Sequence, residues 1–90
     1  MSQARCLGDR NGQTVWVTIG YRESLRGDYM VVESQDAKGR RHAMYSSAFR
    51  RQLLSYQREL KRLGITVPQQ VFRQAAEQGS RHQALYSLDP

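Results

Sequence analysis

The sequence predicts an α+β fold, in which a three- to four-stranded antiparallel meander is followed by one long and one short helix. Three observations indicate this arrangement. Residues 14–19 alternate polar and apolar side chains, as a strand with one buried face does. Turn-forming residues separate this stretch from further runs of β-branched and aromatic residues. From Phe49 onward, apolar residues recur every three or four positions, which is the period of a helix.

The strands are expected over about residues 3–46. Asn11 and Gly12 are typical of a tight hairpin, because both residues tolerate positive φ. After this turn, Val15, Val17 and Ile19 point to one face of the sheet, and Trp16 points to the other with the two neighbouring threonines. A second turn, QDAKGR, with Asp36 and Gly39 as its turn residues, leads into the last strand-like run, RHAMYS.

The long helix is expected over about residues 47–63. Ser46 or Ser47 can cap its start, and Gly64 can adopt the left-handed conformation that ends it. Its apolar residues form one narrow stripe, which we expect to pack on the sheet: Phe49, Leu53, Tyr56, Leu60 and Leu63.

The short helix is expected over about residues 67–78. Thr66 and Gln69 have the spacing of a capping box, Pro68 lies where a missing N–H costs little, and Gly79 is a plausible stop. Its buried side is expected to be Val71, Phe72, Ala75 and Ala76. The extension over residues 79–90 alternates weakly, which is consistent with an edge strand or a loose end. At 90 residues the chain is about the size of one small α+β domain, residues 1–90.

The charge balance favours polyanionic partners. Fourteen Lys and Arg residues stand against eight Asp and Glu, a formal net charge of +6, and twelve of the fourteen are Arg. Arg codons of a G+C-rich genome are a simpler explanation of the same bias. Cys6 is the only cysteine, and the sequence has no secretion-type apolar start and no run that could span a membrane. We therefore expect a cytoplasmic protein without membrane contact.

The sequence contains no pattern that predicts catalysis or a cofactor. His42, His82 and Cys6 are isolated from one another, so no metal site is expected. No nucleophile and base are paired, and no Gly-rich phosphate loop is present. The two histidines lie in similar stretches, RHAMYSS and RHQALYSL, but one extra residue in the second sends them to opposite faces relative to their tyrosines. The similarity therefore indicates two strands with the same packing residues rather than a paired-histidine site.

The long helix is expected to carry a basic face. Its cations fall within an arc of about 120°, nearly opposite the apolar stripe: Arg50, Arg51, Arg58, Lys61 and Arg62. Leu54 lies inside this arc. The face is consistent with an ordinary solvated surface, with contact to the backbone of nucleic acid, or with docking on an acidic protein surface with Leu54 as the apolar anchor.

The sheet offers a second candidate surface. If the valine face meets the helices, Trp16 lies on the other face, with Arg22, Arg40 and Arg41 nearby and a tyrosine from the neighbouring strand beside it. Several single-strand binders stack bases on such aromatic residues. The alternative, which we rate above this one, is that the C-terminal segment or a second subunit covers Trp16, because large aromatic side chains are usually buried.

The run VTIGYRESLRGDYMVVES, followed by MYSS and a helix that ends in LKRLGI, resembles a loose group of small bacterial proteins. The likeness covers roughly residues 13–67 and consists mostly of fold-determining positions: Gly20, Tyr21, Leu25, Tyr29, Met30, Val31, Val32 and Glu33. The resemblance implies a bacterial origin and a compact fold, and it implies no activity.

Together these observations predict a small, basic, non-enzymatic binding module. Nucleic acid is the favoured partner, through the Arg-rich helix face and the aromatic residues of the sheet. The alternative is an interaction protein, such as an inhibitor or accessory protein of a mobile element, that docks on an acidic partner surface. No small-molecule substrate is expected.

Overall fold

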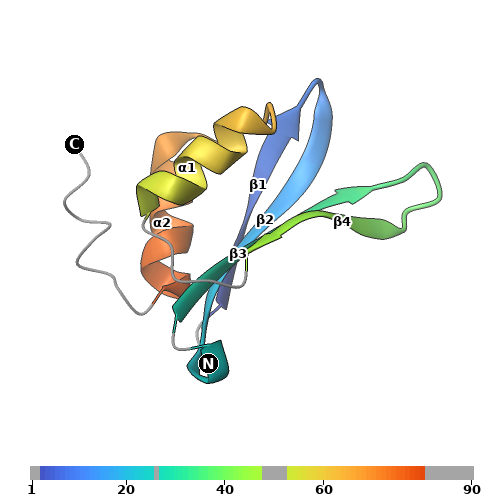
Figure 1. The fold of residues 1–90 in the computed structure, drawn as a ribbon. Coiled ribbons are helices and arrows are strands. Elements are labelled where there is room, and N and C mark those ends of the chain that lie inside the picture. The colour runs from blue at the N-terminus through green and yellow to red at the C-terminus, as the bar shows by residue number, and fades with distance from the viewer. Residues whose placement is uncertain (1–2, 26, 48–52, 81–90) are drawn as a thin grey trace.

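The computed structural model describes residues 3–25, 27–47 and 53–80, and within them it has the predicted α+β fold. A four-stranded antiparallel sheet in the order β1-β2-β3-β4 precedes two helices (Figure 1). The elements are β1 (Gln3–Arg10), β2 (Gln13–Arg22), the 3-10 turn η1 (Glu23–Leu25), β3 (Gly27–Gln35), β4 (Arg41–Ser47), α1 (Leu53–Arg62) and α2 (Gln69–Gly79). The predicted C-terminal extension beyond Ser80 lies outside the described residues.

The first hairpin forms as its turn residues predict. Asn11 and Gly12 both have positive φ, 53° and 83°, and they join Arg10 to Gln13 in a two-residue loop. This turn matches the right-handed twist of the flanking strands. Because the loop has only two residues, it also fixes the register of β1 against β2, in which Leu7 lies directly opposite Trp16.

Both helices lie on one side of the sheet (Figure 1). Between them and the sheet is one hydrophobic core, to which β2 contributes Val15, Val17 and Ile19, as the alternation predicted. The other buried apolar residues are Ala4, Cys6, Met30, Val32, Tyr56, Leu60, Ile65, Phe72, Ala75 and Ala76. A fully buried valine or isoleucine side chain contributes about 1.5–3 kcal/mol, so these positions dominate the stability of the fold.

The second helix lies very close to the sheet at its C-terminal end. A Cβ atom on Gly79 would lie 2.8 Å from the carbonyl carbon of Ile19, so only glycine fits there. The next residue, Ser80, is buried and donates a hydrogen bond from its hydroxyl to the buried carboxylate of Asp28 on β3. These two contacts fix α2 against the strands.

A β-bulge alters the pairing of β3 with β4. Val32 lies opposite Tyr45, but Glu33 lies opposite Ala43, so Met44 is the extra residue. Both Met44 and Tyr45 pack against the core, which strict alternation would not allow. Beyond the bulge the β3–β4 hairpin extends away from the helices (Figure 1).

The structure describes α1 from Leu53 onward, and residues 48–52, next to the predicted start of the long helix, lie outside the described residues. Ser47 is not a helix cap but the last residue of β4, where it pairs with Met30, and Phe49 lies outside the described residues. The predicted end is correct. Gly64 has φ of 75°, and the amide of Ile65 donates to the carbonyl of Leu60 at 2.8 Å, which closes the last turn.

The start of the short helix differs from the prediction. Pro68, not Thr66, is the N-cap, and no side chain caps the helix; Thr66 lies outside it. Its backbone pairs with that of Asp9 through two 2.8 Å hydrogen bonds and extends the edge of β1. Val71, which we expected to be buried, is 38% exposed, whereas Phe72, Ala75 and Ala76 are buried as predicted.

Candidate functional site

The face of the sheet opposite the helices is the candidate binding surface, and we call it the open sheet face. In the part of the chain that the structure describes, neither helix covers it (Figure 1). Its residues are those that alternate with the core positions: Gln3, Arg5, Leu7 and Asp9 from β1, Thr14, Trp16, Thr18, Gly20 and Arg22 from β2, Gly27, Tyr29, Val31, Glu33 and Gln35 from β3, and Arg41, Ala43 and Ser46 from β4. The sequence therefore placed Trp16 on the correct face.

Trp16 lies between Leu7 on β1 and Glu33 on β3 on the open sheet face. Leu7 lies opposite it on β1 and is 55% exposed. Trp16 itself is half-buried. The guanidinium carbon of Arg41 lies 4.8 Å from the centroid of its ring, which is a cation–π contact. Trp16 and Arg41, predicted from the sequence to be neighbours, are brought together.

A second aromatic–arginine pair lies further along β2, and it is part of the fold rather than an accessible surface. The Tyr29 ring lies against Gly20, where a Cβ atom would come within 2.5 Å of Cζ, and its hydroxyl donates to Oε1 of Gln3 at 3.1 Å. Arg22 lies over the ring at 5.0 Å. Because Tyr29 is only 6% exposed, its ring is not available to a ligand.

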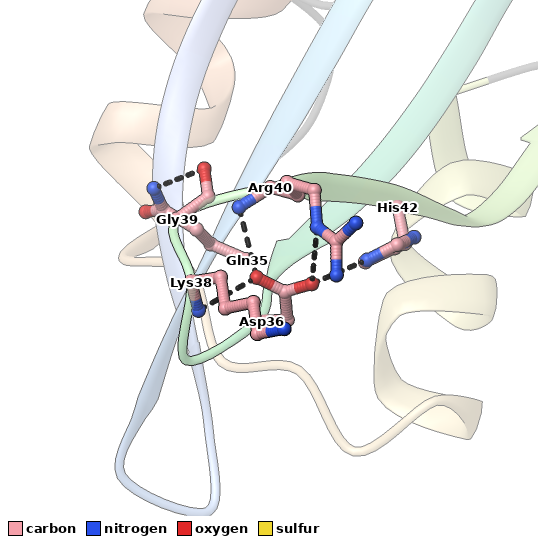
Figure 2. Close-up of polar contacts among 6 residues, drawn as sticks. All are labelled: Gln35, Asp36, Lys38, Gly39, Arg40 and His42. Atoms are coloured by element: carbon pink, nitrogen blue, oxygen red, sulfur yellow. Dashed lines mark hydrogen bonds and ion pairs between the residues drawn. The ribbon is translucent and has the colours of Figure 1, made fainter.

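Arg40, the third arginine expected near Trp16, is held in the β3–β4 turn instead (Figure 2). The Asp36 carboxylate accepts hydrogen bonds from the backbone amides of Lys38 and Arg40, both at 2.9 Å. Its second oxygen lies 2.9 Å from Nε2 of His42 and 3.4 Å from Nε of Arg40. The bond to His42, followed by that from the Arg40 amide, holds the pKa of the Asp36 carboxyl below its ordinary value.

The basic helix face is present in the described part of α1, where Arg58, Lys61 and Arg62 are exposed. Arg62 is engaged by Glu59, with its Nε and a terminal nitrogen at 3.1 and 2.8 Å from one carboxylate oxygen, and this pairing raises the pKa of Arg62. Cations in the last turn of a helix also stabilise its C-terminal carbonyls. This accounts for part of the basic pattern without a ligand.

The other residues predicted for this helix face lie beyond what the structure describes. Arg50 and Arg51 are outside the described residues, and so is the side chain of Leu54. The buried side of α1, with Tyr56 and Leu60, faces the sheet, so its basic side points away from it. The helix face and the open sheet face are therefore on opposite sides of the molecule and cannot form one site.

Cys6, the cysteine of this chain, is buried in the core. Burial raises the pKa of the Cys6 thiol to about 11, which keeps it protonated at neutral pH and makes it a poor nucleophile. Within residues 3–25, 27–47 and 53–80, no three His, Cys, Asp or Glu side chains lie close enough to hold a metal ion. No helix in the same ranges is long and apolar enough to cross a membrane.

Leu7 is the residue of the open sheet face that the sequence analysis missed. The sequence nevertheless contains a pattern that predicts the position of Leu7. The two-residue turn at Asn11 and Gly12 places Arg10 opposite Gln13, and counting back along both strands places Leu7 opposite Trp16.

No protein-family model, curated protein or solved structure matches this chain. Its function is therefore argued from the geometry of the open sheet face.

Proposed function

We propose that this chain is a non-enzymatic nucleic-acid-binding module of the bacterial cytoplasm that contacts nucleic acid through its open sheet face. The observation that carries the proposal is Trp16, a large, half-buried aromatic residue on a sheet face that neither helix covers in the described part of the chain, with the guanidinium of Arg41 stacked on its ring. An aromatic residue on an uncovered sheet, together with arginines, is the arrangement on which single-strand-binding folds stack bases.

The charge of the molecule supports the same partner. The formal net charge is +6, and the open sheet face carries Arg5, Arg22 and Arg41 against Asp9 and Glu33. Arginine presents a planar fork that fits phosphate oxygens. Stacking of a base on an aromatic ring contributes about 1–3 kcal/mol, and each phosphate contact adds a salt-dependent term.

A salt series tests the proposal. Binding of mixed-sequence nucleic acid, measured by fluorescence anisotropy of a labelled strand, should weaken as salt rises, with a log-log slope of about −0.7 for each phosphate contacted on a single strand. Trp16→Ala should reduce the affinity on the order of tenfold, the loss of one stacked base. A slope near zero, or no binding at low salt, would rule the function out.

A matched variant locates the site. Lys61→Glu reverses an exposed charge on the helix side of the molecule. If the open sheet face is the interface, Lys61→Glu should lower the affinity much less than Arg41→Glu, which makes the same change in net charge. An equal or larger effect of Lys61→Glu on the affinity would show that nucleic acid binds at α1 instead of the open sheet face.

Leu7 supports a second candidate function, docking on an acidic protein surface. An exposed apolar residue beside a tryptophan, with Arg5 next to it on the same face of β1, also fits the centre of a protein–protein interface. In this case Leu7→Asp should abolish capture of a protein partner while the fold is retained. In the same case the wild-type protein should show no salt-dependent binding of nucleic acid.

A further inference from the structure

The described arginines differ in what holds their guanidinium groups. Arg10 donates from Nε to the carbonyl of Leu63 at 2.9 Å, Arg40 pairs with a carboxylate in the β3–β4 turn, and Arg62 pairs with a carboxylate on its own helix. Arg41 is exposed, and in the described part of the chain its guanidinium contacts the Trp16 ring without a carboxylate partner. It can therefore leave the ring without breaking an ion pair.

Arg41 lies where it can cover Trp16 and also move aside. It is the first residue of β4, opposite Gln35, at the end of the strand pairing. Its guanidinium covers the ring of Trp16 at 4.8 Å. A cation–π contact at an exposed site is weaker than the stacking of a nucleobase on the same ring, so a base can displace the guanidinium.

We propose that the Arg41 guanidinium covers the Trp16 ring only in the free protein. It is displaced when an unpaired nucleobase of a single strand stacks on the ring. The freed guanidinium then pairs with a phosphate of the same strand, where its planar fork fits the phosphate oxygens. This inference rests on the proposed function and specifies its ligand, because bases inside a duplex are stacked on one another and cannot reach the ring.

The free protein provides the first test, because Trp16 is the only tryptophan and its emission reports this site alone. Arg41→Ala should increase the quenching of Trp16 by acrylamide, since the ring loses its cover. The matched control is Arg40→Ala, which removes the same charge from the neighbouring residue and should leave the quenching unchanged. Equal quenching in wild type and Arg41→Ala would show that Arg41 does not cover the Trp16 ring in the free protein, and would overturn the inference.

The bound state provides the second test, with a short mixed-sequence DNA as single strand and as duplex. The single strand should quench Trp16 emission in wild type and in Arg41→Ala, because the ring accepts the base in both. Arg41→Ala should lose about 0.7 of the log-log salt slope, one phosphate contact, whereas Arg41→Lys should keep the slope.

The outcomes separate the inference from the function on which it rests. If anisotropy reports binding while Trp16 emission does not change, or if the duplex quenches as strongly as the single strand, the inference fails and nucleic-acid binding stands. An unchanged slope in Arg41→Ala also overturns the inference alone. If neither form of the DNA binds at low salt, both proposals fail.

Discussion

At the scale of single residues, Gly20 is required by a close contact rather than by a turn. Gly20 lies in the middle of β2, where glycine normally weakens a strand. Here the missing Cβ leaves room for the Tyr29 ring to cross the strand and reach Gln3. Pairing of an aromatic residue with a strand glycine compensates for the glycine, and it accounts for the burial of the Tyr29 ring on this face, where Thr18 is also buried.

We expect Gly20→Ala to lower the free energy of unfolding by about 1–3 kcal/mol, because the new Cβ overlaps the Tyr29 ring. Chemical denaturation measures the change. The double variant with Tyr29→Ala is the control, since removal of the ring should make the added cost of Gly20→Ala small. If the two substitutions are additive, the contact is not the reason for this glycine.

At the scale of elements, the β3–β4 turn depends on a single ionised side chain. The folded state lowers the pKa of the Asp36 carboxyl, so its ionised form stabilises the turn. This stabilisation is fully present above the ordinary pKa of aspartate and is lost as the pH falls through the lowered folded-state value. The turn should therefore open in acid before the core unfolds.

Amide hydrogen exchange measures this opening. Exchange of the Lys38 and Arg40 amides, which donate to the Asp36 carboxylate, should gain protection as the pH rises through the aspartate range, after correction for the intrinsic rate. In Asp36→Ala both amides should be unprotected at every pH. Protection in that variant equal to wild type would show that the hairpin is fixed by its strands alone.

The C-terminal end of α2 is held close to the sheet at Gly79, which has no Cβ. A Gly→Ala change in a helix usually stabilises a protein by about 0.4–1 kcal/mol. We expect Gly79→Ala to have the opposite effect and to lower the free energy of unfolding by more than about 1 kcal/mol. The new Cβ overlaps the Ile19 backbone and pushes α2 away from the sheet. Gln78→Ala, an exposed change one residue earlier, is the matched control for thermal unfolding. A stabilising Gly79→Ala would contradict the close packing.

At the scale of the whole molecule, the helices and the sheet share one hydrophobic core. We therefore expect a single cooperative unfolding transition, as is usual for small domains. Unfolding curves from Trp16 fluorescence, which reports the open sheet face, and from far-UV circular dichroism should coincide. Separate midpoints would show that the sheet and the helices unfold independently, which would contradict the prediction of one domain.

The candidate site could be predicted from the sequence only in part. Strand alternation identified the face of Trp16, and the proximity of Arg41 followed from its position at the start of the last strand. Arg40 was expected beside them but is engaged by Asp36, because the conformation of a turn, and not chain proximity, decides which way its side chains point. The covering of Tyr29 by Arg22 depends on Gly20, a contact between strands that no local pattern indicates.

The sequence by itself determined the order of strands and helices, the first hairpin and the end of α1. These features depend on residues within a few positions of one another, such as Asn11 with Gly12, and local backbone preferences are sufficient to set them. Only the tertiary structure decided that Ser47 belongs to a strand, that Thr66 pairs with β1, and that the basic helix face and Trp16 point in opposite directions. Each of these depends on which distant residues compete for the same hydrogen bonds and the same buried space, and only the packed chain resolves that competition.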